Sequence, residues 1–377
     1  MERVSRIGLC VLISACGYPP LDRPLDAALA APTADSSVTA PADAASFCYG
    51  SSTSIVKVCL DAAPSNALSI TNLTTIDTTS SPMCASNIVA GGAGYCVIAA
   101  TDIALEAVLR GTGSKPLVLI ASGSITGTNP DAGVDVSSRR SGAPLLGAGH
   151  DPATCKPAAA TPQLKGGGAG GSCISKGGDG GNGELTTNTA GHAADAIAAN
   201  AVVTLRGGCA GQDGDASTGS AGHGGGGVFL ISKTKIELAG TILAGGQGGA
   251  GAAAGQGGGG GAGTGGMIGF DAPSIHVANG VYANGAGGGG GISGGNNAGS
   301  NGTDSSGAGP AAGGDGGANA GGNGGSGSAQ SNGGVGVTAS AGITNNTGGG
   351  GGGGGVGIIK APIAANFNNK VYPAPTP

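Results

Sequence analysis

Long glycine runs that contain few charged or aromatic residues constrain this chain more than any other feature. Glycine contributes 86 of the 377 residues, whereas charged residues make up 10% and aromatic residues 2%. The scarcity of charge and the slightly positive hydropathy exclude most charge-rich disordered chains. Collagen is excluded because no strict Gly-X-Y register with abundant proline is present. Any order in these runs must therefore come from another way of pairing glycine backbone.

The glycine-rich insertions cover roughly residues 137–227, 245–266 and 285–355. Non-glycine residues often recur near every third position, as in GGDGGANAGGNGGSG at 313–327, and three residues per turn is the period of a polyproline-II-type helix. Such a helix has no internal hydrogen bonds, so its amides need partners on neighbouring segments or in water. Ordering seventy residues costs on the order of 100 kcal/mol. The insertions are therefore either fully paired bundles of polyglycine-II or polyproline-II-type helices or flexible loops, and the near absence of charge favours bundles.

A repeat of short β-type segments frames the insertions. The sequence VFLISKTKIELAGTILAGG from Val228 matches MIGFDAPSIHVANGVYANG from Met267 at an offset of 39. A third copy begins at Val356, and a weaker copy at 119–127 resembles 236–244. Each copy contains two short apolar strands around a corner of small residues, and stacked copies could share one core. The sequence therefore predicts an all-β parallel β-helix or β-solenoid, with no substantial α-helix outside a signal peptide.

The ends of this pattern divide the chain into five parts. Residues 16–46 are rich in proline and alanine and predict an extended tether, while 47–136 contain short aliphatic runs and four cysteines. The expected parts are a lipoprotein signal peptide at 1–15, the lipidated cysteine and tether at 16–46, a Cys-containing β segment at 47–136, a glycine-rich insertion at 137–227 that holds Cys155, Cys173 and Cys209, and β rungs with glycine arms at 228–377.

The N-terminal segment has the pattern of an export signal. Arg3 and Arg6 precede an apolar run of seven residues that is too short to span a bilayer. Ile13-Ser14-Ala15-Cys16 resembles the lipobox of bacterial lipoproteins. That resemblance implies a diacylglyceryl group on Cys16 that attaches the mature protein to a membrane. The alternative is an ordinary secretory signal with a chance cysteine.

The residue after the cysteine and the net charge bear on location and partners. Gly17 stands where an aspartate would favour inner-membrane retention in enterobacterial lipoproteins, so the outer membrane is expected. Cleavage would remove Glu2, Arg3 and Arg6, which reduces 21 acidic and 16 basic residues to 20 and 14, a net charge near −6. This balance offers no electrostatic footprint for nucleic acid.

The cysteines predict disulfides rather than a metal site. An exported protein lies in an oxidising compartment, and no two cysteines have the close spacing of zinc motifs. Proximity favours Cys48 with Cys59 and Cys84 with Cys96, whereas Cys155, Cys173 and Cys209 leave one thiol over, with undetermined connectivity.

No catalytic residue is predicted. Gly291–Gly295 (GISGG) fits the GxSxG pattern of a nucleophile elbow, but one chance match is expected in so much glycine, and no histidine follows Ser293. The rungs carry only isolated charges at Lys233, Lys235, Glu237 and Asp271. A β-helix polysaccharide lyase or hydrolase therefore stays an alternative only, because those enzymes use clustered Asp, Arg or Lys.

No cofactor or metal is predicted either, although calcium is the more serious alternative. Acidic residues within glycine turns resemble those of calcium-binding glycine-rich solenoids, but the GGxGxD motif is not reproduced. Calcium needs six to eight converging oxygen ligands. The histidines are scattered without ligand spacing, although His192 and Asp195 could face one another. The acidic candidates are Asp179, Asp213, Asp215 and Asp315, and the histidines are His150, His192, His223 and His276.

Several longer segments resemble the uncharacterised glycine-rich lipoproteins of myxobacteria and related predators. They are FCYG at 47–50, VCL at 58–60, TGSKPLVLIASGSITG at 112–127, LRGGCAG at 205–211 and the polyglycine-VGII close at 348–359. The resemblance covers most of residues 47–360 and implies a β-rung fold at the cell envelope, but it brings no known activity. We therefore expect a non-catalytic surface or envelope lipoprotein with a structural or adhesive role, contacting polysaccharide or neighbouring surface proteins.

Overall fold

The computed structural model describes residues 47–92, 94–142, 144–184, 187–215, 219–255, 257–294, 297–329 and 336–377. The predicted signal peptide, Cys16 and the tether at 16–46 lie outside these ranges. Within them the protein is all-β, and its helical elements are the short 3₁₀ turns η1 (Ala199–Ala201) and η3 (Gly317–Asn319).

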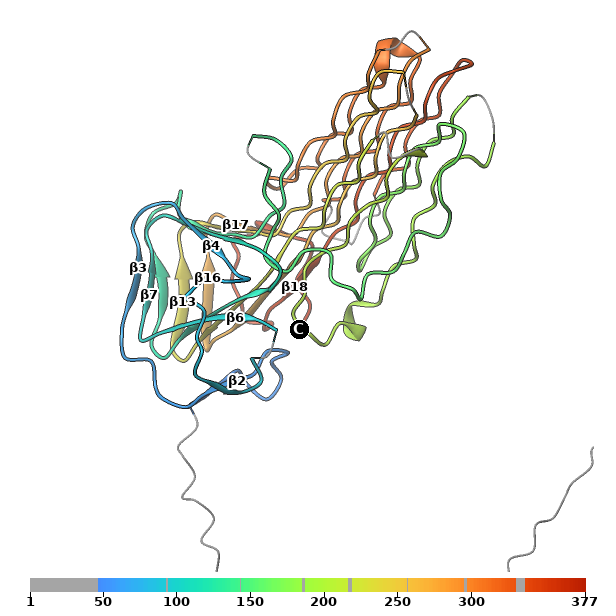
Figure 1. The fold of residues 1–377 in the computed structure, drawn as a ribbon. Coiled ribbons are helices and arrows are strands. Elements are labelled where there is room, and N and C mark those ends of the chain that lie inside the picture. Colours follow the sequence, from blue (N-terminus) through green and yellow to red (C-terminus); the bar gives the residue numbers. More distant parts are fainter. Residues whose placement is uncertain are drawn as a thin grey trace, which may run out of the picture. The chain divides into compact units, whose positions relative to one another are not determined.

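Three parallel sheets form a β-solenoid, as predicted (Figure 1). Sheet 1 contains, in spatial order, β16 (Ser274–Val277), β13 (Lys235–Leu238), β10 (Ile125–Gly127), β7 (Ile103–Leu105) and β3 (Leu68–Ile70). Sheet 2 contains β19 (Val371–Tyr372), β17 (Gly280–Tyr282), β14 (Thr241–Leu243), β11 (Gly133–Asp135), β8 (Val108–Thr112) and β4 (Thr74–Asp77). Sheet 3 contains β18 (Ile358–Lys360), β15 (Met267–Asp271), β12 (Gly227–Ser232), β9 (Leu117–Ala121) and β6 (Cys96–Ala100).

Identical or similar side chains stack along the solenoid core. On sheet 1, Ile103 pairs with Ile125, Ile125 with Ile236, and Ile236 with Ile275, and each is at most 5% exposed. Burial of each such side chain stabilises the fold by about 1.5–3 kcal/mol. One coil alone would leave these residues in water, so the core exists only because the coils stack.

Sheet 3 is buried on both faces, which explains its uninterrupted apolar runs. One face contributes to the solenoid core, and the other packs against Tyr49, Val58 and Leu60. These three residues belong to a small antiparallel sheet that covers this side of the solenoid. Its strands are β1 (Phe47–Tyr49), β2 (Val58–Leu60) and β5 (Ile88–Ala90).

The register confirms most of the predicted repeat and corrects the rest. The offset of 39 holds where β13 pairs with β16 and β14 with β17, but β12 pairs with β15 at an offset of 40, because the following turn is one residue shorter in the second copy. The third copy is confirmed, since β17 pairs with β19. The weak match of 119–127 to 236–244 is wrong in register, because Leu119 lies beside Leu230 and Ile125 beside Ile236.

All three glycine insertions leave the solenoid at one corner, after a strand of sheet 2, and return to a strand of sheet 3. The ladder of sheet 2 continues into them: the N–H of Ser138 donates to Gly245 O at 3.0 Å, and the N–H of Gly246 donates to Asn284 O at 3.0 Å. Successive insertions therefore start one strand spacing apart, about 4.8 Å. The solenoid thus sets the spacing at which the glycine segments begin.

Within the insertions, hydrogen-bond partners repeat every third residue. This is the period of the predicted polyglycine-II or polyproline-II-type helix, and neighbouring segments run side by side in Figure 1. In segment 259–265, the amides of Gly259, Ala262 and Gly265 donate to segment 349–355, those of Gly260 and Gly263 to segment 247–250, and those of Gly261 and Thr264 to segment 209–212.

Three segments are enclosed by six neighbours each, and they are the three purest glycine runs of the chain: 258–266, 285–292 and 348–357. Segment 258–266, for example, also accepts amide hydrogen bonds from segments 168–171, 222–225 and 286–289. Every backbone N–H from Gly259 to Gly266 has a backbone acceptor. A Cβ atom added to Gly261 would lie 1.9 Å from Ala169 O. Most enclosed positions therefore have no room for a Cβ atom, although Ala262 and Thr264 are accommodated at 0% exposure, and complete pairing offsets the cost of ordering the segment.

Candidate functional site

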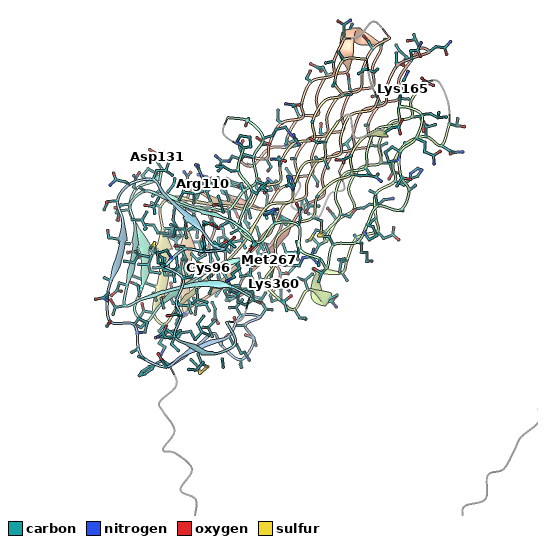
Figure 2. All side chains as sticks on the ribbon, in the orientation of Figure 1. Cys96, Arg110, Asp131, Lys165, Met267 and Lys360 are labelled. Atoms are coloured by element: carbon teal, nitrogen blue, oxygen red, sulfur yellow. A yellow bond between two sulfur atoms is a disulfide. The ribbon has the colours of Figure 1, made fainter. Side chains whose placement is uncertain are left out.

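The outer helices of the glycine bundle place every third residue outward. Segments 311–317, 321–328 and 336–343 lie side by side, joined by bonds such as Gly324 N–H to Gly314 O and Ser340 N–H to Asn323 O. We call their outward surface the neutral face. Figure 2 shows that the bundle carries few side chains, mainly along its borders, whereas side chains crowd the solenoid. The outward residues of the neutral face include Ala312, Asp315, Asn323, Ser326, Thr338 and Ala341.

The neutral face is cross-linked by hydrogen bonds and carries little charge. The Asn323 side chain accepts a hydrogen bond from the N–H of Gly316 at 2.8 Å and so ties two helices together. Asp315 is the single charged residue in the three segments that form the face. Val337 and Ile343 add exposed apolar surface, at 53% and 62%. The surface can thus offer hydroxyl, amide and small apolar groups, but almost no ionic contacts.

Asp304, the other charged residue of the third insertion, is partly buried and binds other segments of the protein. Its carboxylate accepts hydrogen bonds from the N–H groups of Arg140, Ser141 and Gly248 at 2.9–3.0 Å. The Arg140 guanidinium donates to Gly248 O at 2.8 Å and to Ala221 O at 2.7 Å. Burial lowers the pKa of Arg140, and the charges of Asp304 and Asp213 oppose that shift. This clamp connects all three insertions.

The charged residues of the rungs are also engaged in local contacts. The Lys235 ammonium lies 2.6 Å from Glu237, and hydrogen bonding to Lys235 lowers the pKa of that carboxyl. His276 neighbours Glu237 on the adjacent strand. Lys233 lies 4.7 Å from the ring centroid of Tyr49, and Asp271 accepts a hydrogen bond from the N–H of Ser51.

The GxSxG serine has none of the structural context of a nucleophile elbow. Ser293 is 3% exposed at the end of a glycine helix, and its hydroxyl lies 3.4 Å from the Asn297 amide nitrogen. His276, the histidine nearest to it in the sequence, belongs to strand β16 of the solenoid.

Three of the four calcium candidates accept hydrogen bonds from backbone N–H groups, and none of the four belongs to a group of three possible metal ligands among the described residues. Asp179 accepts from the N–H of Ala193 and lies 3.2 Å from His192 Nδ1, so the carboxylate paired with His192 is Asp179, whereas the sequence had suggested that Asp195 could face it. Asp213 accepts from the N–H of Ala221 at 2.7 Å, and Asp215 from the N–H of Lys165 at 2.8 Å. Asp315 lies on the neutral face.

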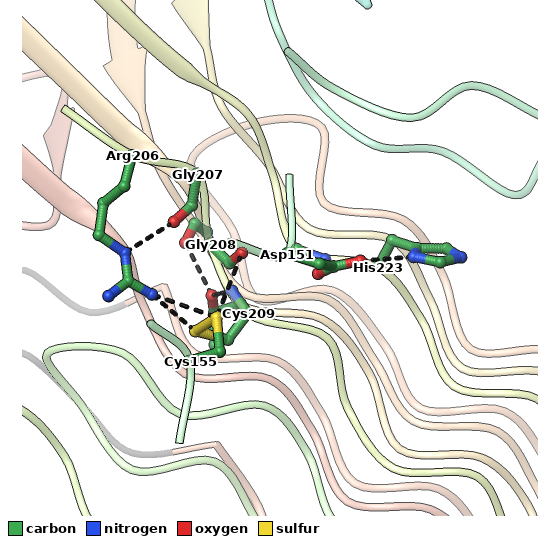
Figure 3. Close-up of a disulfide and its surroundings, with 10 residues drawn as sticks. Asp151, Cys155, Arg206, Gly207, Gly208, Cys209 and His223 are labelled. Carbon is green, nitrogen blue, oxygen red and sulfur yellow. Dashed lines mark hydrogen bonds and ion pairs between the residues drawn. A yellow bond between two sulfur atoms is a disulfide. The ribbon is translucent and has the colours of Figure 1, made fainter. Parts of the chain in front are cut away.

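Three disulfides brace the described chain. The two pairs that proximity favoured, Cys48–Cys59 and Cys84–Cys96, are present. The third joins Cys155 to Cys209, and the Arg206 guanidinium lies against both sulfurs, 3.1 Å from Cys155 and 2.9 Å from Cys209 (Figure 3). Disulfides of this number are typical of exported proteins.

Cys173 was predicted as a disulfide candidate, but in the structure its thiol is free. It is 2% exposed in an apolar cluster with Val202 and Leu205. Burial raises the pKa of this thiol. The seven disulfide candidates are an odd number, so one must stay unpaired. The unpaired cysteine is Cys173, which packs into the apolar cluster.

The structure brings together one group of residues that sequence analysis kept apart. His150 and Asp151 lie 72 and more positions before His223, yet one ligand atom from each lies within 4.8 Å of the others. Asp151 and His223 face one another near the Cys155–Cys209 disulfide (Figure 3). No spacing rule could have joined them, because their approach depends on how the first glycine insertion folds back.

These features define an exported β-solenoid protein that projects a bundle of glycine helices. No protein-family model, no curated protein and no solved structure matches the chain. No helix among the described residues is long and apolar enough to cross a membrane.

Proposed function

We propose that this protein is a non-catalytic envelope lipoprotein that adheres to polysaccharide through the neutral face, while the lipid on Cys16 holds it at the outer membrane. The observation that carries the proposal is a hydrogen-bonded, nearly uncharged face whose outward groups recur every three residues along antiparallel helices. Repeated hydroxyl and amide groups suit the repeated hydroxyls of an uncharged polysaccharide. Neighbouring surface proteins coated with such glycans would be contacted in the same way.

Rigidity favours this role over that of a loose spacer. Side chains that are already ordered lose little conformational freedom when they bind, so many weak contacts can add up. The pairing of Asp304 with backbone amides and of Lys235 with Glu237 also argues for a structural use of the charges. These contacts support adhesion over catalysis.

The binding test uses the purified protein on beads of dextran, cellulose and agarose. The double variant Ala312→Lys/Ala341→Lys places charge on the neutral face without entering the bundle, since both residues are exposed. We expect at least about tenfold weaker retention, equivalent to about 1.4 kcal/mol. The matched control is Ala253→Lys, an exposed alanine at a turn between two glycine helices. Equal retention of wild type and double variant, or no retention of the wild type, contradicts adhesion through this face.

The anchor has a separate test. Intact mass spectrometry of protein extracted from membranes should find a diacylglyceryl adduct on an N-terminal Cys16, and Cys16→Ser should release the protein from the membrane fraction. A mature chain without the adduct contradicts the anchor and leaves the adhesion test unaffected.

A further inference from the structure

We propose that His150, Asp151 and His223 bind a divalent transition-metal ion of the zinc class. Two imidazoles and one carboxylate are borderline ligands that select zinc, copper, nickel or cobalt over calcium and magnesium. The three ligand atoms lie within 4.8 Å of one another, and all three residues are half-buried. The group is thus close enough to converge on one ion and still reachable from solvent.

The ring nitrogens of the two histidines are positioned for this role. His150 Nδ1 lies 2.9 Å from Gly147 O, and in the tautomer that donates to this carbonyl, Nε2 is the nitrogen that can ligate a metal. An imidazole whose second nitrogen donates to a backbone carbonyl is the usual arrangement of a metal ligand. His223 Nδ1 lies 2.5 Å from Asp151 Oδ2 in a hydrogen bond, and a metal ion that takes both atoms as ligands would replace the shared proton. The two imidazole rings are 5.6 Å apart and perpendicular.

The backbone beneath the group is held from several sides. Asp151 adopts a left-handed conformation with φ of 46°, which few non-glycine residues adopt, and its N–H donates to Gly208 O at 3.0 Å. Its second carboxylate oxygen accepts from the N–H of Gly224 at 2.9 Å. The N–H of His223 lies 3.2 Å from Gln247 Oε1. Because the backbone that carries the ligands is already held, less ordering entropy opposes binding.

The group at Asp151 contains more than a single carboxylate–imidazole hydrogen bond. The Asp179–His192 pair, at 3.2 Å, is a carboxylate–imidazole contact in the same insertion without a second histidine. At Asp151 a second imidazole lies beside the pair, and its Nε2 has no protein partner among the described residues. Three protein ligands would leave a coordination position for water or an outside donor, the pattern of an open zinc site.

The test is calorimetric titration of the purified, chelator-treated protein with Zn²⁺, with Ca²⁺ as a second titrant. We expect one equivalent of Zn²⁺ to bind and Ca²⁺ to give no heat. His223→Gln keeps a hydrogen-bond donor for Asp151 and removes the imidazole, and His150→Ala removes the second nitrogen. Each should weaken binding by at least about 10–100-fold, the loss seen when even a supporting residue of a metal site is changed.

The matched control is His192→Ala, which removes an imidazole paired with a carboxylate elsewhere in the bundle and should leave Zn²⁺ affinity unchanged. Electron paramagnetic resonance of the Cu²⁺-loaded protein gives a second readout: coupling to two nitrogens in the wild type and to one in His223→Gln. Thermal melts verify that the variants fold. The proposal is overturned if the wild type binds no Zn²⁺, if both site variants bind like wild type, or if His192→Ala abolishes binding.

Discussion

The sharpest test of the bundle is Gly351→Ala, in the middle of the enclosed segment 348–357. A Cβ atom on Gly351 would lie 1.9 Å from Gly260 O and 2.3 Å from Gly260 C, whereas ordinary contact begins near 3.4 Å. The atoms that it meets are backbone, so no side chain can rotate away. The two helices would have to separate by about 1.5 Å, the difference between these contact distances.

Separating the two helices costs free energy through their hydrogen bonds. Gly259 N–H to Gly349 O and Ala262 N–H to Gly352 O, both 2.9 Å, are the two bonds between the helices that flank Gly351. Leaving these buried donors poorly paired costs about 1–3 kcal/mol each, and overpacking costs about 1–3 kcal/mol more. Gly351→Ala should therefore lower the free energy of unfolding of the bundle by at least about 3 kcal/mol. That is a large fraction of the total of about 5–15 kcal/mol for a typical domain.

Hydrogen exchange with mass spectrometry is the assay, because it reports stability segment by segment. Peptides covering 345–357 should lose protection in Gly351→Ala, while peptides of β9 and β12 keep it. The control is Gly307→Ala, where an added Cβ meets nothing within 4 Å, so its effect should be near zero or stabilising by up to about 1 kcal/mol. Equal protection in Gly351→Ala, Gly307→Ala and wild type would refute the close packing.

Four further outcomes are expected. Asp304→Ala should destabilise the bundle by about 2–4 kcal/mol in chemical denaturation, because it removes the acceptor for the amides of Arg140 and its neighbours. Asp315→Ala, at an exposed position, should change stability by less than about 0.5 kcal/mol. Hydrogen bonds from Ser124 lower the pKa of Asp102 in the folded protein. This carboxylate therefore contributes stability above about pH 4, and that stability is lost as the pH falls through the lowered pKa. Asp102→Asn should make acid unfolding less steep. Buried Cys173, with its raised thiol pKa, should resist N-ethylmaleimide until the protein unfolds, and rapid labelling of the native protein, read by mass spectrometry, would contradict its placement.

Local sequence patterns predicted much of the solenoid because each rung repeats its own apolar spacing. Ile236 and Ile275 occupy equivalent places in two copies, and the structure pairs them. The weaker copy at 119–127 was misaligned because short apolar runs match in more than one register, and only the neighbouring strand decides between them. Ile125 stacks on Ile236 since that register continues the isoleucine ladder of the core.

The candidate sites were harder to predict because they join distant segments. Asp304 meets Arg140, and His223 meets Asp151, only because different parts of the glycine insertions lie side by side. Glycine runs carry no side-chain pattern that could specify which neighbour pairs with which. The sequence offered Asp195 only as a residue that could face His192, and the structure places Asp179 beside it instead.

By itself, the sequence determined that the chain is all-β, that its rungs stack, and that its glycine runs need complete backbone pairing to be ordered. These conclusions rest on local periodicity and on the energetic cost of fixing glycine. Only the tertiary structure decided that all three insertions leave from one corner and that the purest runs become the enclosed helices. The physical reason is that the solenoid starts successive insertions one strand spacing apart, and at that spacing most residues of a helix with six neighbouring helices have no room for a Cβ atom.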